Sequence, residues 1–488
     1  MQHSITVFIP FFGNDSTFKT IANLRKNSLI KEIILLAVGK PAKPIDGFQT
    51  FKVEYLWGSK TIELVKERST SLFTMILTQD NLIELSQFAL ERLTKVAEDT
   101  GAGLVYPDYY DYKNDMLIPH PNIDYQLGSI RNDFDMGYIY LINTYAMKES
   151  FEEHIKDDYK FAGLYDLRLK ISQNFPIIRV PEFLYTATVD DARKFGEKIF
   201  DYVNPKNRAV QIEMETVCTN HLKSIGAYLE PKFETVNLDE GNFEVEASVV
   251  IPVKNRIKTI REAVDSAMKQ KTSFQFNIIV VDNYSNDGTT DFLKSLAKKD
   301  GRLILIVPER KDLGIGGCWN EAINHPQCGK FVIQLDSDDV YKDETTIQKI
   351  VNKFYEEKCA MVIGSYIITN FELKEIPPGI IDHQEWTPDN GRNNALRING
   401  LGAPRAFYTP VLRKINFPNV SYGEDYAVAL AVSRDYQIGR IYEPIYLCRR
   451  WEENSDASPD INKQNQFNFY KDRLRSFEII ARQRKNKL

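Results

Sequence analysis

Short apolar runs alternate with helical patterns through the second half of the chain. The runs 247–252, 276–281 and 331–335 are rich in β-branched residues and have the length of buried strands. Between the first two, apolar side chains recur at helical spacing over residues 257–268. Strands that alternate with helices at this pitch form βαβ units with parallel pairing and right-handed crossovers. We therefore expect an α/β fold in which helices flank a mostly parallel sheet.

The first half of the chain repeats this plan. Residues 9–14 (IPFFGN) resemble residues 251–255 (IPVKN), and residues 75–80 (MILTQD) resemble residues 332–338 (VIQLDSD). Such self-similarity indicates duplicated structural units, although chance similarity between two α/β domains is the alternative. The predicted limits are 1–190 for a first domain, 191–241 for a helical connector, 242–460 for a second domain and 461–488 for a basic C-terminal helix.

The composition is that of a globular protein, with 43% hydrophobic and 26% charged residues among 488. The formal net charge is −5, whereas dedicated nucleic-acid binders carry a basic excess, so we expect no nucleic-acid partner. The five cysteines are scattered without CxxC spacing, which predicts neither a disulfide framework nor a zinc site. Reduced thiols of this kind favour a cytoplasmic protein.

Neither a signal peptide nor a membrane span is expected. The N-terminus lacks a basic start, and its apolar run ends at Pro10. No apolar stretch approaches the ~20 residues of a transmembrane helix. The segment from Lys471 onward is rich in lysine and arginine and offers a peripheral contact with an anionic inner membrane face. A solvated terminal helix is the interpretation that we favour for it.

Carboxylates gather directly after the run 331–335, at Asp336, Asp338 and Asp339. Ligands of open α/β sheets bind at the carboxyl ends of the strands. Two carboxylates one residue apart can hold a hard divalent cation, which commonly shares its coordination shell with phosphates. Alternatively, these side chains cap the following helix. The pentapeptide alone leaves both interpretations open.

Taken together, the motifs of residues 246–455 resemble those of family 2 glycosyltransferases of the GT-A fold. The resemblance implies two tandem GT-A-like domains, a nucleotide-diphosphate-sugar donor, a Mn²⁺ or Mg²⁺ ion, and transfer to a hydroxyl of a carbohydrate or lipid-linked glycan acceptor. The matching segments, in the family's order, are 248–255 (SVVIPVKN), 280–289 (VVDNYSNDGT), 313–322 (LGIGGCWNEA), 335–339 (LDSDD) and 423–425 (GED).

By this resemblance, Asp338 would contact the metal, and Asp336 would bind the ribose or a metal-bound water. Asp282 would contact the nucleoside, and the next residue is Asn283 where the family often has a second aspartate. The other residues that the resemblance assigns to donor binding are Pro252, Lys254, Gly314, Asn320, Gly402, Arg449 and Arg450. The alternative for Gly402 is a simple turn, and the alternative for Arg449 and Arg450 is surface ion pairing.

By the same resemblance, Asp425 is the general base and Glu424 orients the acceptor or holds Asp425. A carboxylate in that place removes the acceptor's proton during the attack. The alternative is that both are first-turn residues favoured by the helix dipole. Retaining relatives often have a histidine metal ligand near Arg450, and none occurs there. We therefore expect an inverting reaction.

The first half departs from the family's pattern at its functional positions. Val38 or Gly39 stands in place of Asp282 and Thr78 in place of Asp336, although Asp80 aligns with Asp338. We also equate Tyr165 and Asp166 with the acidic pair 424–425. We therefore expect a degenerate copy with little or no activity, which contributes packing or acceptor binding.

Two rival functions remain at this point. A sugar-phosphate nucleotidyltransferase has a similar fold, but its glycine- and lysine-rich phosphate signature is absent from both halves. A non-catalytic glycan- or protein-binding scaffold is the other. The resemblance favours bacterial-type surface glycan or polysaccharide synthesis on the cytoplasmic face of the membrane. Neither donor sugar nor nucleobase is predicted, because one fold hosts many specificities.

Overall fold

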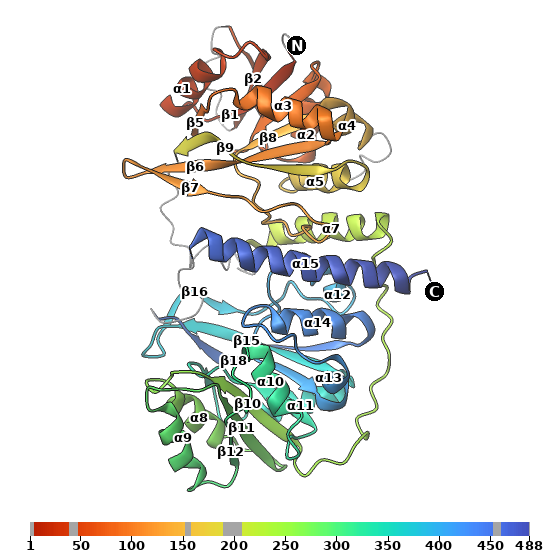
Figure 1. The fold of residues 1–488 in the computed structure, drawn as a ribbon. Coiled ribbons are helices and arrows are strands. Elements are labelled where there is room, and N and C mark those ends of the chain that lie inside the picture. The colour runs from red at the N-terminus through yellow and green to blue at the C-terminus, as the bar shows by residue number, and fades with distance from the viewer. Residues whose placement is uncertain (1–3, 39–46, 152–157, 189–206, 452–459, 488) are drawn as a thin grey trace. The chain divides into compact units, whose positions relative to one another are not determined.

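The computed structural model describes residues 4–38, 47–151, 158–188, 207–451 and 460–487 (Figure 1). The chain divides into two compact units. Unit 1 consists of Met1–Arg193, Ala209–Tyr228 and Pro459–Ser476, and unit 2 consists of Lys194–Arg208, Leu229–Ser458 and Phe477–Leu488.

Unit 1 is built on a nine-stranded mixed sheet of order β3-β2-β1-β4-β8-β6-β9-β5, with β7 paired to β6. Strands β3, β2, β1 and β4 are parallel, and β8 runs antiparallel to both β4 and β6. The elements are β1 (Ile5–Phe11), α1 (Asp15–Leu24), β2 (Ile30–Val38), β3 (Gln49–Val53), α2 (Ser59–Arg68), β4 (Phe73–Leu77), β5 (Leu82–Leu85), α3 (Ala89–Thr100), β6 (Leu104–Lys113), β7 (Met116–His120), β8 (Ile139–Asn143), α4 (Thr144–Glu149), α5 (Gly163–Asn174), β9 (Ile177–Thr188) and α7 (Arg208–Ser224).

Both faces of this sheet are covered, which explains why β1 is apolar at every position. Val7 and Ile9 point to one face, into a core completed by α1 and α3. Phe8 points to the opposite face, into a core completed by α2, α4 and α5. The strand therefore reads as a continuous hydrophobic run.

Unit 2 has the same topology: its strand order is β12-β11-β10-β13-β17-β15-β18-β14, with β16 paired to β15. The elements are β10 (Ala247–Val253), α8 (Ile260–Met268), β11 (Phe276–Asp282), α9 (Thr289–Ala297), β12 (Leu303–Ile306), α10 (Ile315–Ile323), β13 (Phe331–Gln334), β14 (Val340–Tyr341), α11 (Thr346–Glu357), β15 (Met361–Thr369), β16 (Glu375–Ile381), α12 (Gly391–Asn394), β17 (Arg405–Tyr408), α13 (Thr409–Ile415), α14 (Glu424–Asp435) and β18 (Ile438–Arg449).

The strand registers equate the two units residue by residue. Ile5 pairs with Phe73 in unit 1, as Ala247 pairs with Phe331 in unit 2. The prolines of β1 and β10 stand at the same position of their strands. The predicted α/β class, with two tandem GT-A-like domains, is confirmed by this shared topology.

The segments outside the two sheets differ from the simple connector and tail that the sequence suggested. α7 lies in the range predicted as a connector and groups with unit 1, while residues 229–246 contain no helix. The range 189–206 lies outside the described residues. The predicted domain limits remain predictions.

The C-terminal helix α15 (Ile461–Lys485) is not the solvated helix that we expected. Asp472, Arg475 and Arg482 are fully buried in it. Nη1 of Arg475 donates to Oδ1 of Asp472 over 2.8 Å, and Nε of Arg482 donates to Oε1 of Glu478 over 2.7 Å. Ion pairs within the helix thus compensate the charges and allow that face to be buried. None of the described helices is long and apolar enough to cross a membrane.

Candidate active site at the carboxyl edge of the second sheet

Asp336 is separated from the end of β13 by one residue, Leu335, and its position is fixed from two sides. Its backbone N–H donates to the hydroxyl of Tyr446 in β18 over 3.0 Å. Its Oδ1 accepts from Nε2 of Gln334 over 2.8 Å. Both partners come from buried strand positions. The carboxylate is therefore held at the strand end rather than serving as a helix cap.

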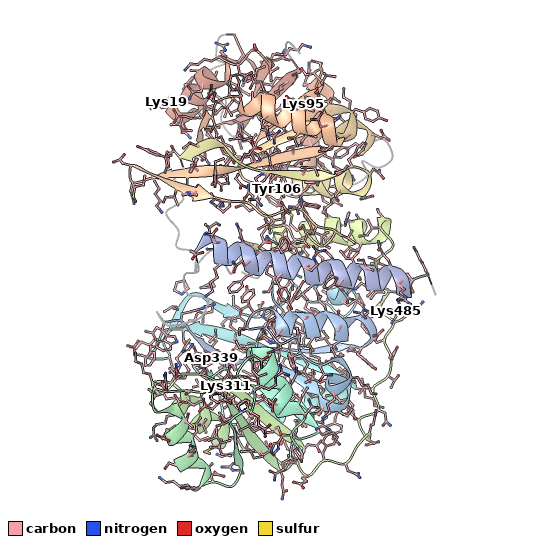
Figure 2. The ribbon with its side chains drawn as sticks, viewed as in Figure 1. Lys19, Lys95, Tyr106, Lys311, Asp339 and Lys485 are labelled. Atoms are coloured by element: carbon pink, nitrogen blue, oxygen red, sulfur yellow. The ribbon has the colours of Figure 1, made fainter. Side chains whose placement is uncertain are left out.

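Asp338 is held by residues at the end of β18. Its Oδ2 accepts from Nε1 of Trp451 over 3.2 Å, and its carbonyl oxygen accepts from Nε of Arg449. The backbone N–H of Arg449 donates to Oδ1 of Asp339 over 2.7 Å (Figure 2 labels Asp339). The Arg449 guanidinium also pairs with Glu262. Arg449, which we expected to bind donor phosphate, thus makes contacts that shape the acidic turn.

The acidic pair opens α14, after Gly423 at φ 79°. Oδ2 of Asp425 lies 2.7 Å from Nη1 of Arg405, the first residue of β17. Glu424 is buried, and its Oε2 has no hydrogen-bond partner among the described residues. The sequence predicted no role for Arg405, whose only signal is that it ends a stretch of small residues, 400–405 (GLGAPR).

Several carboxylates converge here, and the pKa values of Asp336 and Glu424 are raised as a result. Burial raises the pKa of Asp336, as do the carboxylates of Asp338 and Asp425, while Arg405 lowers it. Burial and the Asp425 carboxylate raise the pKa of Glu424 to about 8. Like charges in a partly dry site repel, and a cation relieves that repulsion.

The chemistry of these donors fits a hard divalent cation, which prefers carboxylate oxygens. Asp336 and Asp338 are the residues that would hold it, because both follow the strand end one residue apart. Within the described ranges, no three histidine, cysteine, aspartate or glutamate side chains form a metal-holding group by themselves.

The predicted nucleoside residues lie at the ends of β10 and β11. Asp282 is fully buried, and its oxygens accept from the N–H of Ser285 over 3.0 Å and from the hydroxyl of Thr290. Nδ2 of Asn283 donates to the carbonyl of Leu313 over 2.8 Å, and Asn283 is partly exposed. Asp282 therefore organises its loop, while Asn283 offers the more accessible polar group.

Pro252 and Lys254 lie beside this pair. Pro252 pairs with Val281 across the sheet and is partly exposed. Lys254 directly follows β10 and is exposed. The structure thus brings both residues to the edge at which β11 ends.

The glycine-rich segment 314–317 at the start of α10 packs against residues 418–420. The N–H of Gly314 donates to Oδ1 of Asn419 over 2.7 Å, and a Cβ at Gly314 would lie 2.5 Å from the carbonyl carbon of Val420. The side chain of Asn320 forms two hydrogen bonds with the backbone of Phe417. These residues hold the segment that leads to Glu424.

Gly402 is packed against a buried histidine. Its φ is +104°, and a Cβ there would lie 2.3 Å from Nε2 of His383. Nδ1 of His383 pairs with Oε1 of Glu385 over 2.8 Å. Arg450 is partly buried, and its backbone N–H donates to the carbonyl of Thr369 over 2.8 Å. Gly402 is thus required by close packing, and its carbonyl faces Arg405.

Comparison with known proteins settles the family of this unit. Residues 248–415 match the family described as Glycosyl transferase family 2. Unit 2 contains a family 2 glycosyltransferase domain. Similar curated proteins include an uncharacterized glycosyltransferase of Rickettsia felis, 32% identical over 202 residues (41% of this chain and 32% of that protein). The poly(ribitol-phosphate) beta-glucosyltransferase of Bacillus spizizenii is 25% identical over 221 residues (44% and 34%).

The chain spans about a third of the length of these relatives, which are matched over 32% and 34% of their own length. Among solved structures, S. aureus TarS 1–349 in complex with UDP shares 22% sequence identity with a TM-score of 0.37, covering 48% of this chain and 65% of that one.

Unit 1 lacks most of the polar groups found in the family 2 domain. The registers place Ala37 at the position of Asp282, one residue before Val38; Gly39 lies outside the described residues. Thr78 and Asp80 follow β4 as Asp336 and Asp338 follow β13. The Asp80 carboxylate accepts hydrogen bonds from the N–H of Phe12, Nδ2 of Asn14 and the hydroxyl of Thr17.

Our equation of Asp166 with the general base is wrong by two residues. α5 and α14 both have twelve residues, and in both cases two residues separate the helix from the next strand. That alignment places Gly163 and Leu164 at the acidic pair. It also equates Tyr165 with Tyr426, and both hydroxyls donate to backbone carbonyls. The equivalence predicted from the sequence was wrong because it depended on spacing across loops, which can differ in length. The ends of helices and strands align the two units more reliably.

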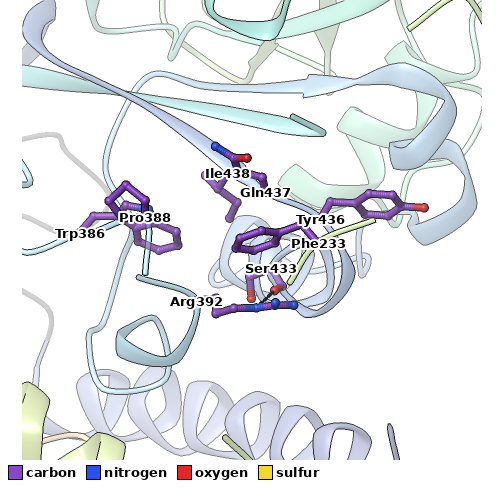
Figure 3. A pocket seen from close by; sticks show the side chains of 8 residues that line it. All are labelled: Phe233, Trp386, Pro388, Arg392, Ser433, Tyr436, Gln437 and Ile438. Atoms are coloured by element: carbon purple, nitrogen blue, oxygen red, sulfur yellow. Dashed lines mark hydrogen bonds between the residues drawn. The ribbon is translucent and has the colours of Figure 1, made fainter. Parts of the chain in front are cut away.

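A small pocket in the family 2 domain shares no lining residue with the carboxylate cluster (Figure 3). Nε of Arg392 donates to the carbonyl of Ser433 over 2.9 Å, and its guanidinium lies 4.4 Å from the Phe233 ring centroid. These contacts are structural. The lining residues are Phe233, Trp386, Pro388, Arg392, Ser433, Tyr436, Gln437 and Ile438.

Proposed function

We propose that the family 2 domain transfers a sugar from a nucleotide-diphosphate-sugar donor to an acceptor hydroxyl, with a divalent cation and inversion at the anomeric carbon. One observation carries this proposal. The carboxylates of Asp336 and Asp425, which come from distant parts of the sequence, are linked through Arg405 and Gln334. Nη1 of Arg405 lies 2.7 Å from Oδ2 of Asp425, and its backbone N–H donates to Oε1 of Gln334, whose Nε2 donates to Oδ1 of Asp336. A metal-binding turn and a candidate base thus share one site.

Asp336 and Asp338 would hold Mn²⁺ or Mg²⁺, whose remaining ligands are oxygens such as those of phosphate and water. When bound, the ion supplies Lewis-acid stabilisation of the leaving diphosphate. Asn283, Pro252 and Lys254 line the nucleoside end of the site in this proposal, and Asp282 shapes its loop.

Asp425 is the proposed general base. Its carboxylate takes the proton of the acceptor hydroxyl as the new C–O bond forms and the bond to the diphosphate breaks. Attack opposite the leaving group inverts the anomeric carbon. Nη1 of Arg405 lies 2.7 Å from Oδ2 of Asp425 and holds the carboxylate in place. Glu424, whose pKa is raised to about 8, carries a proton at neutral pH and can donate a hydrogen bond to the acceptor.

The name of one relative supports a class of acceptor. The Bacillus spizizenii relative is named for poly(ribitol-phosphate), so we propose a hydroxyl of a cell-surface carbohydrate or polyol polymer, or its lipid-linked form. Cytoplasmic transfer at the inner membrane face fits a nucleotide-sugar donor. Unit 1 is proposed to be non-catalytic, because Asp80 is its one carboxylate at the matched positions and already accepts hydrogen bonds from Phe12, Asn14 and Thr17.

Ligand-dependent thermal stability tests the proposal. UDP, GDP and CDP and their sugar conjugates are added with and without Mn²⁺ to wild type and Asp338→Ala. A ligand at about 100 times its dissociation constant stabilises a protein by ~2.7 kcal/mol. A Mn²⁺-dependent shift with one nucleotide, lost in Asp338→Ala, supports the transferase. No shift with any nucleotide favours the scaffold, and pyrophosphate release from a nucleoside triphosphate and a sugar phosphate favours the nucleotidyltransferase.

A further inference from the structure

Arg405 links the two parts of the proposed site, the acidic turn after β13 and the acidic pair that opens α14. Its backbone N–H donates to Oε1 of Gln334 over 3.1 Å, and Nε2 of Gln334 donates to Oδ1 of Asp336 over 2.8 Å. Its guanidinium lies 2.7 Å from Oδ2 of Asp425. One residue thus connects the turn after β13 with the first turn of α14.

The conformation of Arg405 is itself fixed by the segment that precedes β17. Nη1 of Arg405 donates to the carbonyl of Gly402 over 2.8 Å. Gly402 lies against His383, which is buried and paired with Glu385. The side chain of Arg405 is only 18% exposed. A guanidinium held in this way can fix the direction of a carboxylate, because its planar N–H groups are directional donors.

Unit 1 shows that the fold does not need these contacts. The strand registers place Tyr140 at the position of Arg405 and Ile76 at that of Gln334. Thr78 stands at the position of Asp336, and the helix alignment places Leu164 at that of Asp425. The same topology therefore forms without any of the four polar side chains. Their joint presence in unit 2 points to function rather than folding.

We propose that Arg405 is a positioning residue that aligns Asp425 with the Asp336 turn for transfer. This inference rests on the reaction proposed above. The glycine at position 402 has a counterpart in Gly137, which also has positive φ. The loop shape is thus common to both units, and the Arg405 contacts are specific to the unit with the acidic pair.

The proposal is tested with the Arg405→Met and Arg405→Lys variants. Steady-state release of nucleoside diphosphate is measured with Mn²⁺ and whichever UDP-, GDP- or CDP-sugar the wild type turns over. Misplacement of a reacting group costs about 100-fold in rate. We expect kcat of Arg405→Met to fall by about that factor, while KM for the donor stays within about threefold and Arg405→Lys retains an intermediate rate. Guanidinium ion, below denaturing concentration, should partly restore Arg405→Ala.

The matched control is Arg434→Met. Arg434 lies in the last turn of the same helix α14 and pairs with Glu478 over 2.5 Å. It should alter stability but not kcat. The proposal is overturned if Arg405→Met keeps kcat within twofold of wild type, or if neither lysine nor guanidinium restores any activity.

A donor-free measurement separates this inference from failure of the proposed reaction. Removal of Arg405 leaves the carboxylate of Asp425 without its cation, so Arg405→Met should lower Tm less in an Asp425→Asn background than in wild type. Equal decreases in both backgrounds would contradict the contact, whether or not any donor is turned over. If this double-mutant cycle shows coupling between Arg405 and Asp425 but Asp338→Ala leaves turnover unchanged, the proposed reaction is wrong and the contact is right.

Discussion

The indole Nε1 of Trp451 donates a hydrogen bond to Oδ2 of Asp338 over 3.2 Å. The guanidinium of Arg256 and the ammonium of Lys258 both lie 5.9 Å from the Trp451 ring centroid. A tryptophan in contact with the proposed metal ligand, among cations, makes the site visible by fluorescence.

Binding of Mn²⁺ with a nucleoside diphosphate should therefore change tryptophan emission. A metal at Asp338 withdraws electron density from the oxygen that accepts the indole N–H, and a diphosphate alters the field of the two cations. Fluorescence titration of wild type and Trp451→Phe checks this. The chain has four tryptophans, so an unchanged signal in Trp451→Phe would assign the response to another ring.

Gly402→Ala should destabilise the family 2 domain. The backbone at φ +104° is unfavourable for alanine, and its Cβ would meet His383 at 2.3 Å. We expect a loss of about 1–3 kcal/mol in the free energy of unfolding, with reduced turnover because the Gly402 carbonyl binds Arg405. Gly301→Ala is the control, since a Cβ there has nothing within 4 Å. Equal stability of the two variants in chemical denaturation would refute the packing argument.

Stability should depend on pH through Glu424. Its pKa is raised from 4.5 to about 8 by burial and by Asp425, so the folded protein binds more protons than the unfolded chain between these values. The contribution of Glu424 to stability is therefore fully present below pH 4.5 and is lost as the pH rises toward 8.

Glu424→Gln cannot ionise and should escape this loss. Its stability relative to wild type should increase from pH 5 to pH 8, by on the order of 1–3 kcal/mol. Denaturant unfolding at a series of pH values measures the difference. A constant difference across that range would mean that Glu424 is already ionised in the folded protein at pH 5.

The fold was predictable because β10, β11 and β13 are buried on both faces and therefore read as continuous apolar runs. The acidic turn 336–339 and the pair 424–425 were found because their residues are adjacent in sequence. Arg405 was not found, because its contact with Asp425 depends on the antiparallel placement of β17 beside β13. No local pattern encodes that pairing.

The roles of single residues were less predictable than their positions. Arg449 was expected to bind phosphate, but its backbone and guanidinium hold the turn that contains Asp338. Asn320 was expected at the donor, but both polar atoms of its amide bind Phe417. A sequence identifies a polar side chain, whereas only the structure shows which partner satisfies it.

The most direct test of the central claim compares two register-equivalent aspartates. Mn²⁺-dependent release of nucleoside diphosphate from a panel of UDP-, GDP- and CDP-sugars is measured for wild type, Asp338→Ala and Asp80→Ala. We predict that Asp338→Ala loses at least about 100-fold in kcat/KM, whereas Asp80→Ala keeps wild-type turnover. Full activity in Asp338→Ala, or loss of activity in a folded Asp80→Ala, would contradict a single active site in unit 2.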